Sequence, residues 1–270
     1  MSARRRPSRA VGVVTVAAAL VVGAGAAWAL GGPDTDAPAA LDSPTHAQAQ
    51  PTAPATPPAP TPTPTPTPDP TPTFDLTAHS TTDPTSPWVV ANKAHHLDPI
   101  DYAPDDLVPF GGEKVRAAVA KDLQAMFDAA ADDGVHLVMH SGYRAYSYQK
   151  VIFNNMLAVH GRDHAERYSA RPGYSEHQTG LAADLSGKSK PSCELQECFG
   201  ETVEGRWIAK HASEFGFLVR YQAENKATTG YSAEPWHVRW VGRDLAAYMA
   251  EHHVTTLEEV FDVTGGATYH

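Results

Sequence analysis

The sequence of 270 residues predicts an α+β domain in which helices flank a small antiparallel sheet. A helical pattern of apolar residues comes first, over 113–131. Short runs with strand-like alternation gather later in the chain, at 181–185, 217–221 and 236–240. Because helices come early and strands gather afterwards, an α+β arrangement is favoured over a wound parallel sheet.

The remaining elements follow from local patterns along the chain. The helix over 113–131 ends at Asp132-Asp133-Gly134, and its apolar stripe consists of Val115, Val119, Leu123, Met126, Phe127 and Ala130. A strand is expected over 135–140 and a helix over 145–159, whereas 92–109 lacks periodicity and is expected to form loops. Later helices are expected over 205–215, 244–253 and 257–261.

The first residues, 1–31, have the features of a targeting segment. A basic start contains Arg4, Arg5, Arg6 and Arg9, and residues 11–30 are apolar and uncharged. Ala27-Trp28-Ala29 is similar to a small-x-small cleavage site, but the apolar stretch is also just long enough to span a bilayer. A cleaved signal peptide and a retained membrane anchor both stay open. Either predicts that the rest of the chain is exported, in secreted or membrane-anchored form.

Residues 32–86 are dominated by Pro, Thr, Ala and Asp, with a near Thr-Pro repeat at 61–70. Large apolar residues are too few to offset the loss of chain entropy on folding. The segment is therefore expected to be a disordered spacer of polyproline character. A single folded domain is expected over 87–265, which is long enough for one hydrophobic core, and we expect a monomer.

Charge and cysteine content limit the partners and the compartment. The formal net charge is −10, and the Arg cluster lies in the targeting segment, so the exported part is more acidic still. Nucleic acid is disfavoured as a partner, because phosphate binding needs a basic face. Cys193 and Cys198 are too few for a zinc knuckle and favour a local disulfide in an oxidising compartment, with two unpaired thiols as the alternative.

Two short segments carry the candidate chemistry. The first is Ser175-Glu176-His177-Gln178-Thr179-Gly180-Leu181-Ala182-Ala183-Asp184, and the second is Glu234-Pro235-Trp236-His237. Side chains alternate on a strand, so Asp184 and His237 are expected to face away from the core, with Glu234 just outside the second strand. Two imidazoles, a carboxylate and a further acid form the donor set and the general base of a catalytic zinc site.

These segments resemble the zinc D-alanyl-D-alanine carboxypeptidases and dipeptidases of the VanY type, within the LAS peptidases. The family pattern is Ser-x-His-x-x-Gly-x-Ala-x-Asp followed by Glu-x-x-His, and Ser141-Gly142-Tyr143-Arg144 matches a further family segment. The resemblance covers about residues 91–261. It implies that Zn²⁺ is bound by His177, Asp184 and His237, that Glu234 is the catalytic base, and that Arg144 binds the substrate.

The resemblance also implies a substrate. Gln149 and Ser175 are candidates to hold the substrate's carboxylate, in addition to Arg144. The expected reaction removes the terminal D-alanine from peptidoglycan stem peptides. An L,D-carboxypeptidase, a D,D-dipeptidase and an endopeptidase stay open as alternatives on the same site. A wall-binding module without activity is a more distant alternative.

Overall fold

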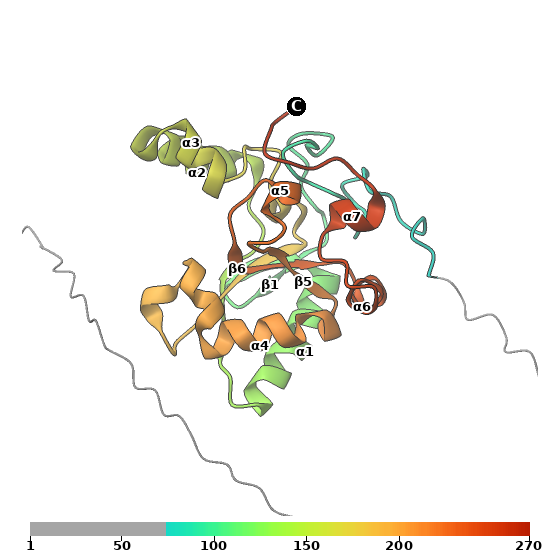
Figure 1. The fold of residues 1–270 in the computed structure, drawn as a ribbon, viewed down its shortest axis with the longest axis vertical. Coiled ribbons are helices and arrows are strands. Elements are labelled where there is room, and N and C mark those ends of the chain that lie inside the picture. Colours follow the sequence, from blue (N-terminus) through green and yellow to red (C-terminus); the bar gives the residue numbers. More distant parts are fainter. Residues whose placement is uncertain (1–73) are drawn as a thin grey trace, which may run out of the picture. The chain divides into compact units, whose positions relative to one another are not determined.

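The structure, a computed structural model, describes residues 74–270 (Figure 1). The expected targeting segment at 1–31 and the expected linker as far as residue 73 lie outside the described residues. Within the described part, no helix is both long enough and apolar enough to cross a membrane. Residues 74–86, which were assigned to the linker, contain packed side chains: the Phe74 ring lies 5.8 Å from the Trp88 ring and 5.0 Å from the Tyr248 ring.

A four-stranded antiparallel sheet forms the centre of the domain, in the order β3-β4-β6-β5. Its strands are β3 (Leu137–Ser141), β4 (Ala182–Gly187), β5 (Phe217–Tyr221) and β6 (Glu234–Trp240). Ala183, Leu185 and Val238 belong to the main apolar core, so the neighbouring residues Asp184 and His237 face the other side of the sheet. The predicted α+β fold with a small antiparallel sheet is confirmed.

The start of the helix expected over 113–131 is a strand instead. β1 (Leu107–Phe110) and β2 (Glu113–Arg116) form an antiparallel hairpin, and α1 (Ala117–Asp132) begins only after it. Gly111 and Gly112 make this turn possible, because both have positive φ, +59° and +94°, which other residues rarely adopt. The expectation of loop as far as residue 109 is wrong for β1, whereas the apolar stripe of α1 is buried as predicted.

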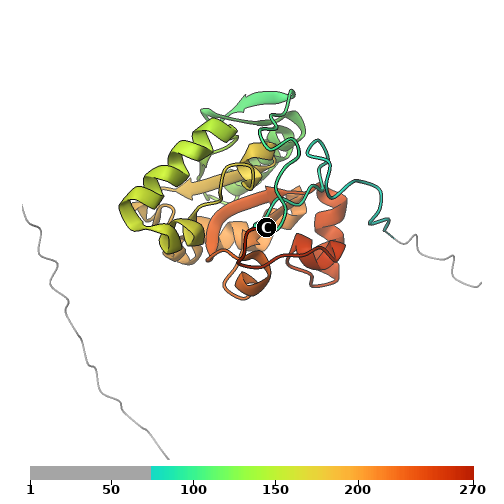
Figure 2. The same ribbon diagram turned by 90° about the horizontal axis from the view of Figure 1, so that it is seen from above.

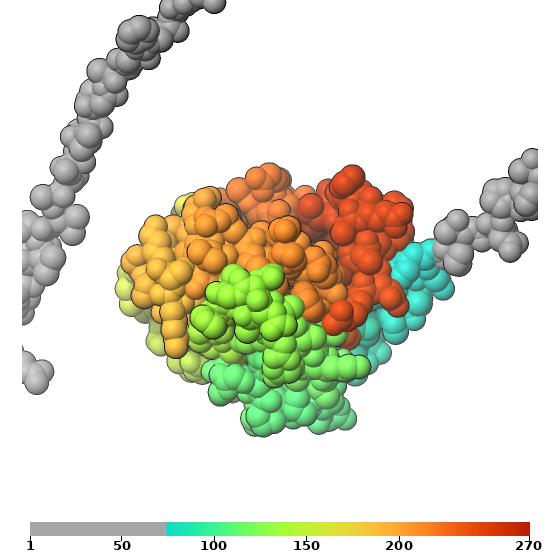
Figure 3. Space-filling view, turned by 90° about the horizontal axis from the view of Figure 1, so that it is seen from below, coloured from blue at the N-terminus to red at the C-terminus, as the bar shows by residue number. Residues whose placement is uncertain are grey.

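Helices cover one face of the sheet. α1 and α4 (Val203–His211) lie on this side, and Figure 3 shows residues of α1 (green) beside those of 203–215 (orange). The Trp207 indole Nε1 donates a hydrogen bond to Asp133 Oδ2 at 2.8 Å and so joins α4 to the end of α1. The main core includes residues of both helices and of the sheet, among them Val119, Leu123, Met126, Leu185, Ile208, Phe217 and Val238.

The other helices lie at the sides of the sheet. α2 (Tyr146–His160) and α3 (Arg162–Tyr168) project on the side opposite α6 (Arg243–Glu251) and α7 (Leu257–Phe261), as Figures 1 and 2 show. α6 and α7 form a second apolar cluster with Trp88 and Val90. The helices predicted over 145–159, 205–215, 244–253 and 257–261 are present as α2, α4, α6 and α7, with slightly different ends. α3 and the short α5 (Lys226–Thr229) were not predicted.

A disulfide closes the loop between β4 and α4. Cys193 and Cys198 are bonded to each other, as predicted. Cys193 is buried within the main core, and a short 3-10 helix, Glu197–Glu201, begins inside the ring and continues beyond it. The disulfide therefore attaches this loop to the body of the domain.

Candidate metal centre and active site

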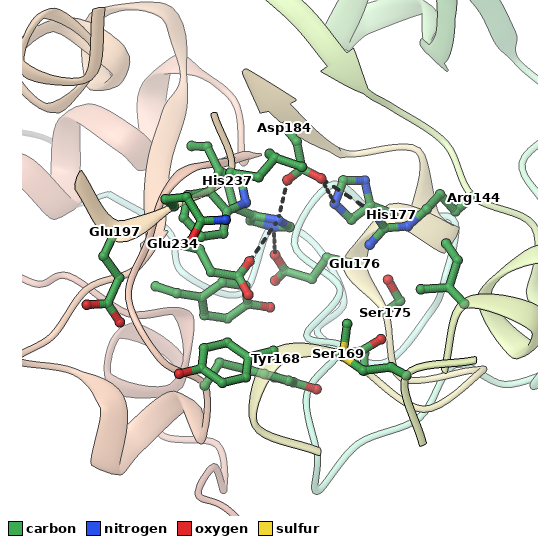
Figure 4. A pocket seen from close by; sticks show the side chains of 18 of the residues that line it. Arg144, Tyr168, Ser169, Ser175, Glu176, His177, Asp184, Glu197, Glu234 and His237 are labelled. Atoms are coloured by element: carbon green, nitrogen blue, oxygen red, sulfur yellow. Dashed lines mark hydrogen bonds and ion pairs between the residues drawn. The ribbon is translucent and has the colours of Figure 1, made fainter. Parts of the chain in front are cut away.

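Three side chains that could share a cation meet on the outer face of the sheet (Figure 4). His177, Asp184 and His237 each offer one donor atom, and these atoms all lie within 4.8 Å of one another. Asp184 on β4 and His237 on β6 are directly paired across the sheet, which brings their side chains together. His177 lies in a 3-10 helix, Glu176–Thr179, that ends at Gly180, where φ of +68° turns the chain into β4.

The His177 ring is held with one nitrogen free for a metal. Its Nδ1 donates a hydrogen bond to the Gly142 carbonyl at 2.7 Å, so Nε2 carries the lone pair. Nε2 is buried 3.2 Å from Asp184 Oδ2 but has no hydrogen-bond partner. Burial, with the nearby Arg144 charge, lowers the pKa of His177 to about 4, so the ring is neutral at pH 7. An unpartnered buried nitrogen with a lone pair fits a metal ligand.

The His237 ring is held through Nε2, the nitrogen that points away from Asp184. Its Nε2 donates to Glu176 Oε2 at 3.2 Å, and its Nδ1 lies 3.1 Å from Asp184 Oδ1, toward the cluster. Burial alone would lower the pKa of His237, but the carboxylates of Asp184 and Glu176 outweigh this and raise it to about 9. Negative charge therefore dominates at the cluster and favours a cation there.

Glu176 belongs to this site but was not identified by motif reasoning. Its buried carboxylate accepts hydrogen bonds from Arg220 Nε at 2.8 Å and Arg239 Nη1 at 2.9 Å, besides the one from His237. Burial alone would raise the pKa of Glu176, but the two guanidinium groups hold it well below its usual range. The sequence does contain a signal for such a partner. Arg220 and Arg239 lie in mainly apolar strands, at 217–221 and 236–240, and buried charges are usually paired.

The Glu234 carboxyl lies beside the metal-ligand cluster. Its Oε2 is 3.9 Å from His237 Nδ1. Glu234 is the first residue of β6, so the expectation that it lies just outside the strand is corrected: the strand begins at Glu234 itself. Burial raises the pKa of Glu234 to about 7. A carboxyl group with this pKa can both accept and donate a proton near neutral pH.

Arg144 brings a positive charge to the same cluster. Its Nη1 lies 3.5 Å from Asp184 Oδ2, and its backbone N–H donates to the His177 carbonyl at 3.1 Å. Its Nε is buried and has no hydrogen-bond partner in the described part of the chain. Gly142, two residues before Arg144, lets the chain pass close to Lys114, because a Cβ at that position would collide with the Lys114 carbonyl oxygen. Arg144 therefore has an unused donor next to the candidate metal site.

Comparison with known proteins agrees with this arrangement. The model of the VanY family, described as D-alanyl-D-alanine carboxypeptidase, matches residues 112–243, which contain the whole cluster. The protein YodJ of Bacillus subtilis (strain 168) is 40% identical over 190 residues, which are 67% of this chain and 68% of that protein. The chain belongs to the VanY family of D-alanyl-D-alanine carboxypeptidases. The predicted family is confirmed, and with it the prediction of a peptidase.

Solved structures of VanY-like enzymes share the fold. The LdcB LD-carboxypeptidase is 39% identical, with a TM-score of 0.61, and the match covers 67% of this chain and 88% of that one. A variant of the vancomycin-resistance D,D-pentapeptidase VanY, solved in complex with Zn(II), is 31% identical with a TM-score of 0.55. That match covers 64% of this chain and 97% of the other. The predicted zinc cofactor is confirmed at the level of the family.

The VanY-type cluster lies in a pocket of about 800 Å³. α2 and α3 form one wall of the pocket, the disulfide loop forms another, and side chains around β5 and β6 form a third. In that order, the lining residues include Ile152, Met156 and Tyr168; Leu195 and Glu197; and Tyr221, Tyr231 and Trp236. Trp236 both packs against the main core and lines this pocket. Tyr221 and Tyr231 were not identified from the sequence.

The two predicted carboxylate-binding residues differ in position. Ser175 lines the pocket next to the cluster, whereas Gln149 is fully buried and is not among the lining residues. Gln149 Nε2 donates to Ser169 Oγ at 3.2 Å and to the Ala170 carbonyl at 2.8 Å. Ser169 and Ala170 do line the pocket. Gln149 thus supports the pocket wall, and its direct contact with substrate stays a prediction.

Proposed function

We propose that this VanY-family protein is a zinc D,D-carboxypeptidase that removes the terminal D-alanine from peptidoglycan stem peptides outside the cytoplasm. The observation that carries the proposal is the juxtaposition, in one pocket, of a buried His-Asp-His cluster, the Glu234 carboxyl and the Arg144 guanidinium. The family's description as D-alanyl-D-alanine carboxypeptidase supplies the substrate class.

We assign His177 Nε2, the Asp184 carboxylate and His237 Nδ1 as the zinc ligands. Zinc bound there would polarise the scissile carbonyl and lower the pKa of a water molecule. The Gly142 carbonyl and the Glu176 carboxylate hold the outer ring nitrogens of His177 and His237. Such outer contacts orient metal-binding rings and raise their basicity.

We assign Glu234 as the general base and general acid. Its carboxylate takes a proton from the attacking water and then gives a proton to the nitrogen of the leaving D-alanine. The water oxygen first bonds to the carbonyl carbon, and the C–N bond breaks when the leaving nitrogen receives its proton, so one water is consumed for each D-alanine released. The pKa of about 7 suits both transfers, because it lies near the working pH.

Arg144 and Ser175 are assigned to substrate binding. The guanidinium of Arg144 can donate to the carbonyl oxygen that gains negative charge during attack, or to the terminal carboxylate of the peptide. The Ser175 hydroxyl lines the same pocket and offers a further donor. Both donors favour a substrate that ends in a free carboxylate.

The test is digestion of a stem pentapeptide ending in D-Ala-D-Ala by the full chain, followed by mass spectrometry of the products. We expect loss of a single D-alanine. Glu234→Gln should keep its zinc in metal analysis and lose turnover by about 10²–10⁴-fold. His177→Ala should lose zinc. Near-normal hydrolysis by Glu234→Gln, or full zinc occupancy in His177→Ala, would contradict these assignments.

An L,D-carboxypeptidase is the second candidate, and the similarity to the LdcB LD-carboxypeptidase favours it. This enzyme class removes a D-alanine that follows an L-centre. The same digestion decides between the two when a stem tetrapeptide with that terminus is included. Free D-Ala-D-Ala and cross-linked muropeptides in parallel reactions test the dipeptidase and endopeptidase alternatives.

We also propose that residues 1–31 direct export, as a cleaved signal peptide or a membrane anchor, and that the Pro/Thr-rich segment from residue 32 is a spacer through which the domain reaches the cell wall. The peptidase family described above supports an extracytoplasmic location, because its substrate lies there. Fractionation of cells that express the full chain tests this location. Size-exclusion chromatography with light scattering tests the expected monomer.

A further inference from the structure

The pocket contains one acidic side chain that the proposed reaction does not use. Four acids line the pocket: Glu176, Asp184, Glu197 and Glu234. Glu176 is paired with buried arginines, Asp184 belongs to the metal-ligand cluster and Glu234 is the proposed base. Within the described part of the chain, no ion pair engages the exposed carboxylate of Glu197. Glu197 is therefore free to act on a ligand in the pocket.

Glu197 and Arg144 lie at opposite ends of the cluster. β3 and β6 are both antiparallel to β4, so they run in the same direction. The end of β3, which leads to Arg144, and the start of β6 at Glu234 therefore lie at opposite ends of the sheet. The short 3-10 helix that begins at Glu197 packs against this start of β6, because a Cβ at Gly200 would lie 3.3 Å from Pro235 Cβ. Figure 4 shows the same order, with Glu197 beyond Glu234 and Arg144 beyond His177.

The loop that carries Glu197 is held on both sides. Cys193 is 1% exposed within the main core, and its disulfide to Cys198 closes the ring immediately after Glu197. Phe199 is 2% exposed, and its carbonyl accepts a hydrogen bond from Thr202 Oγ1 at 2.7 Å. The position of Glu197 at the pocket wall is thus set by the ring and by two buried anchors rather than by a free loop.

We propose that Glu197 is a specificity-determining residue that binds an ammonium group of the substrate on the N-terminal side of the scissile bond. This inference rests on the proposed function and on the second of the two roles given there to Arg144, in which the guanidinium binds the terminal carboxylate. A peptide bound in that direction passes the metal-ligand cluster and continues toward Glu197. Among the lining residues of the described chain, Arg144 is the single Lys or Arg, so no lysine or arginine competes at the Glu197 end. The preferred substrate class is a peptide with a free side-chain amine near the bond that is cut.

The test compares two peptides that differ by one charge. Both end in D-Ala-D-Ala and carry a lysine before it; in one the ε-amine is free, and in the other it is acetylated. Wild-type full chain should cleave the free-amine peptide with kcat/KM higher by about two- to fivefold, the range expected for an exposed ion pair. This preference should appear in KM and should shrink as salt is raised, because exposed charges are screened.

Glu197→Gln should remove the preference, and Glu197→Lys should reverse it toward the acetylated peptide. Glu194→Gln is the matched control, because Glu194 lies in the same ring, contacts His140 instead, and is not a pocket residue. It should keep the wild-type preference. An unchanged ratio of the two peptides in Glu197→Gln would overturn the inference while leaving the proposed function standing. Failure of wild type to cleave either peptide would instead refute the proposed function.

Discussion

Glu176 and His237 are joined by a hydrogen bond of 3.2 Å between the buried Oε2 and the ring Nε2, on the side of the imidazole that faces away from Asp184. The same carboxylate also binds the guanidinium groups of Arg220 and Arg239. The orientation of one proposed metal ligand therefore depends on an ion-pair network buried in the domain.

Replacement of Glu176 tests this dependence. Glu176→Gln should weaken zinc binding about 10–100-fold, because the ring of His237 loses its carboxylate partner. Competition with a chelator of known affinity measures the change. The variant also removes the negative charge that pairs with the buried Arg220 and Arg239, so urea unfolding must first show that it is folded. Zinc affinity equal to wild type in a folded Glu176→Gln protein would contradict the orienting role.

Arg144→Lys should separate substrate binding from metal binding. A lysine keeps the charge but not the planar fork of donors, so we expect kcat/KM to fall by about 10²–10³-fold while zinc content stays constant. Steady-state kinetics on the D-Ala-D-Ala peptide and metal analysis of the same sample check both parts. Loss of zinc would show instead that Arg144 acts by holding Asp184, from which its Nη1 lies 3.5 Å away.

Acid should destabilise the domain through Glu258. Burial alone would raise the pKa of Glu258, but its bonds from Arg220, at 2.9 and 2.7 Å, outweigh this and lower the pKa. The folded protein then binds this proton less tightly than the unfolded chain does. The stabilising effect is present above the unfolded pKa, roughly 4.3, and is lost as pH falls toward the lower folded value.

The free energy of unfolding in urea, measured between pH 7 and pH 3, checks this expectation. Glu258→Gln should be less stable at pH 7 and should show a flatter decline on acidification. Glu251→Gln is a suitable control, because Glu251 is exposed at the end of α6. The same steep decline in Glu258→Gln as in wild type would assign the acid sensitivity to other carboxylates.

The disulfide should matter for substrate binding as well as for stability. The double variant Cys193→Ala with Cys198→Ser opens the ring, and the loss of a constraint over so short a loop is worth about 2 kcal/mol of unfolding free energy. Leu195, Gln196 and Glu197 line the pocket from this loop, so KM should rise while kcat changes little. Thermal unfolding and peptide kinetics measure the two effects. A fall in kcat with constant KM would place the loop's role in the chemical step.

The sequence predicted the strands that carry the cluster because they follow a simple rule. In 181–185 and 236–240 every second residue is apolar and lies in the main core or packs against it, so the faces of Asp184 and His237 follow from alternation alone. The disulfide also follows from composition, because the chain contains no other cysteine. Local patterns of this kind need no knowledge of distant parts of the chain.

The features that were not predicted depend on contacts between distant residues, or on an apolar pattern that fits both a helix and a strand. Val115 is apolar and fits both the helical stripe and the strand β2, and only the Gly111-Gly112 turn decides between them. Glu176 occupies an unspecified position of the motif, and its role appears only when Arg220 and Arg239 lie on adjoining strands. Gln149 lies behind the pocket wall because it bonds to Ser169 and Ala170, which are distant in the sequence. Its closeness to Arg144 along the chain does not predict this position.

The buried network has a consequence for how the enzyme matures. From His237 the contacts run through Glu176 and Arg220 to Glu258 on α7, and Glu258 accepts a hydrogen bond from Asn92 at 2.9 Å. Segments near residues 92, 176, 220 and 258 must therefore all dock before the imidazole of His237 is oriented. Zinc capture should be a late event, completed only after the sequence beyond residue 258 has folded.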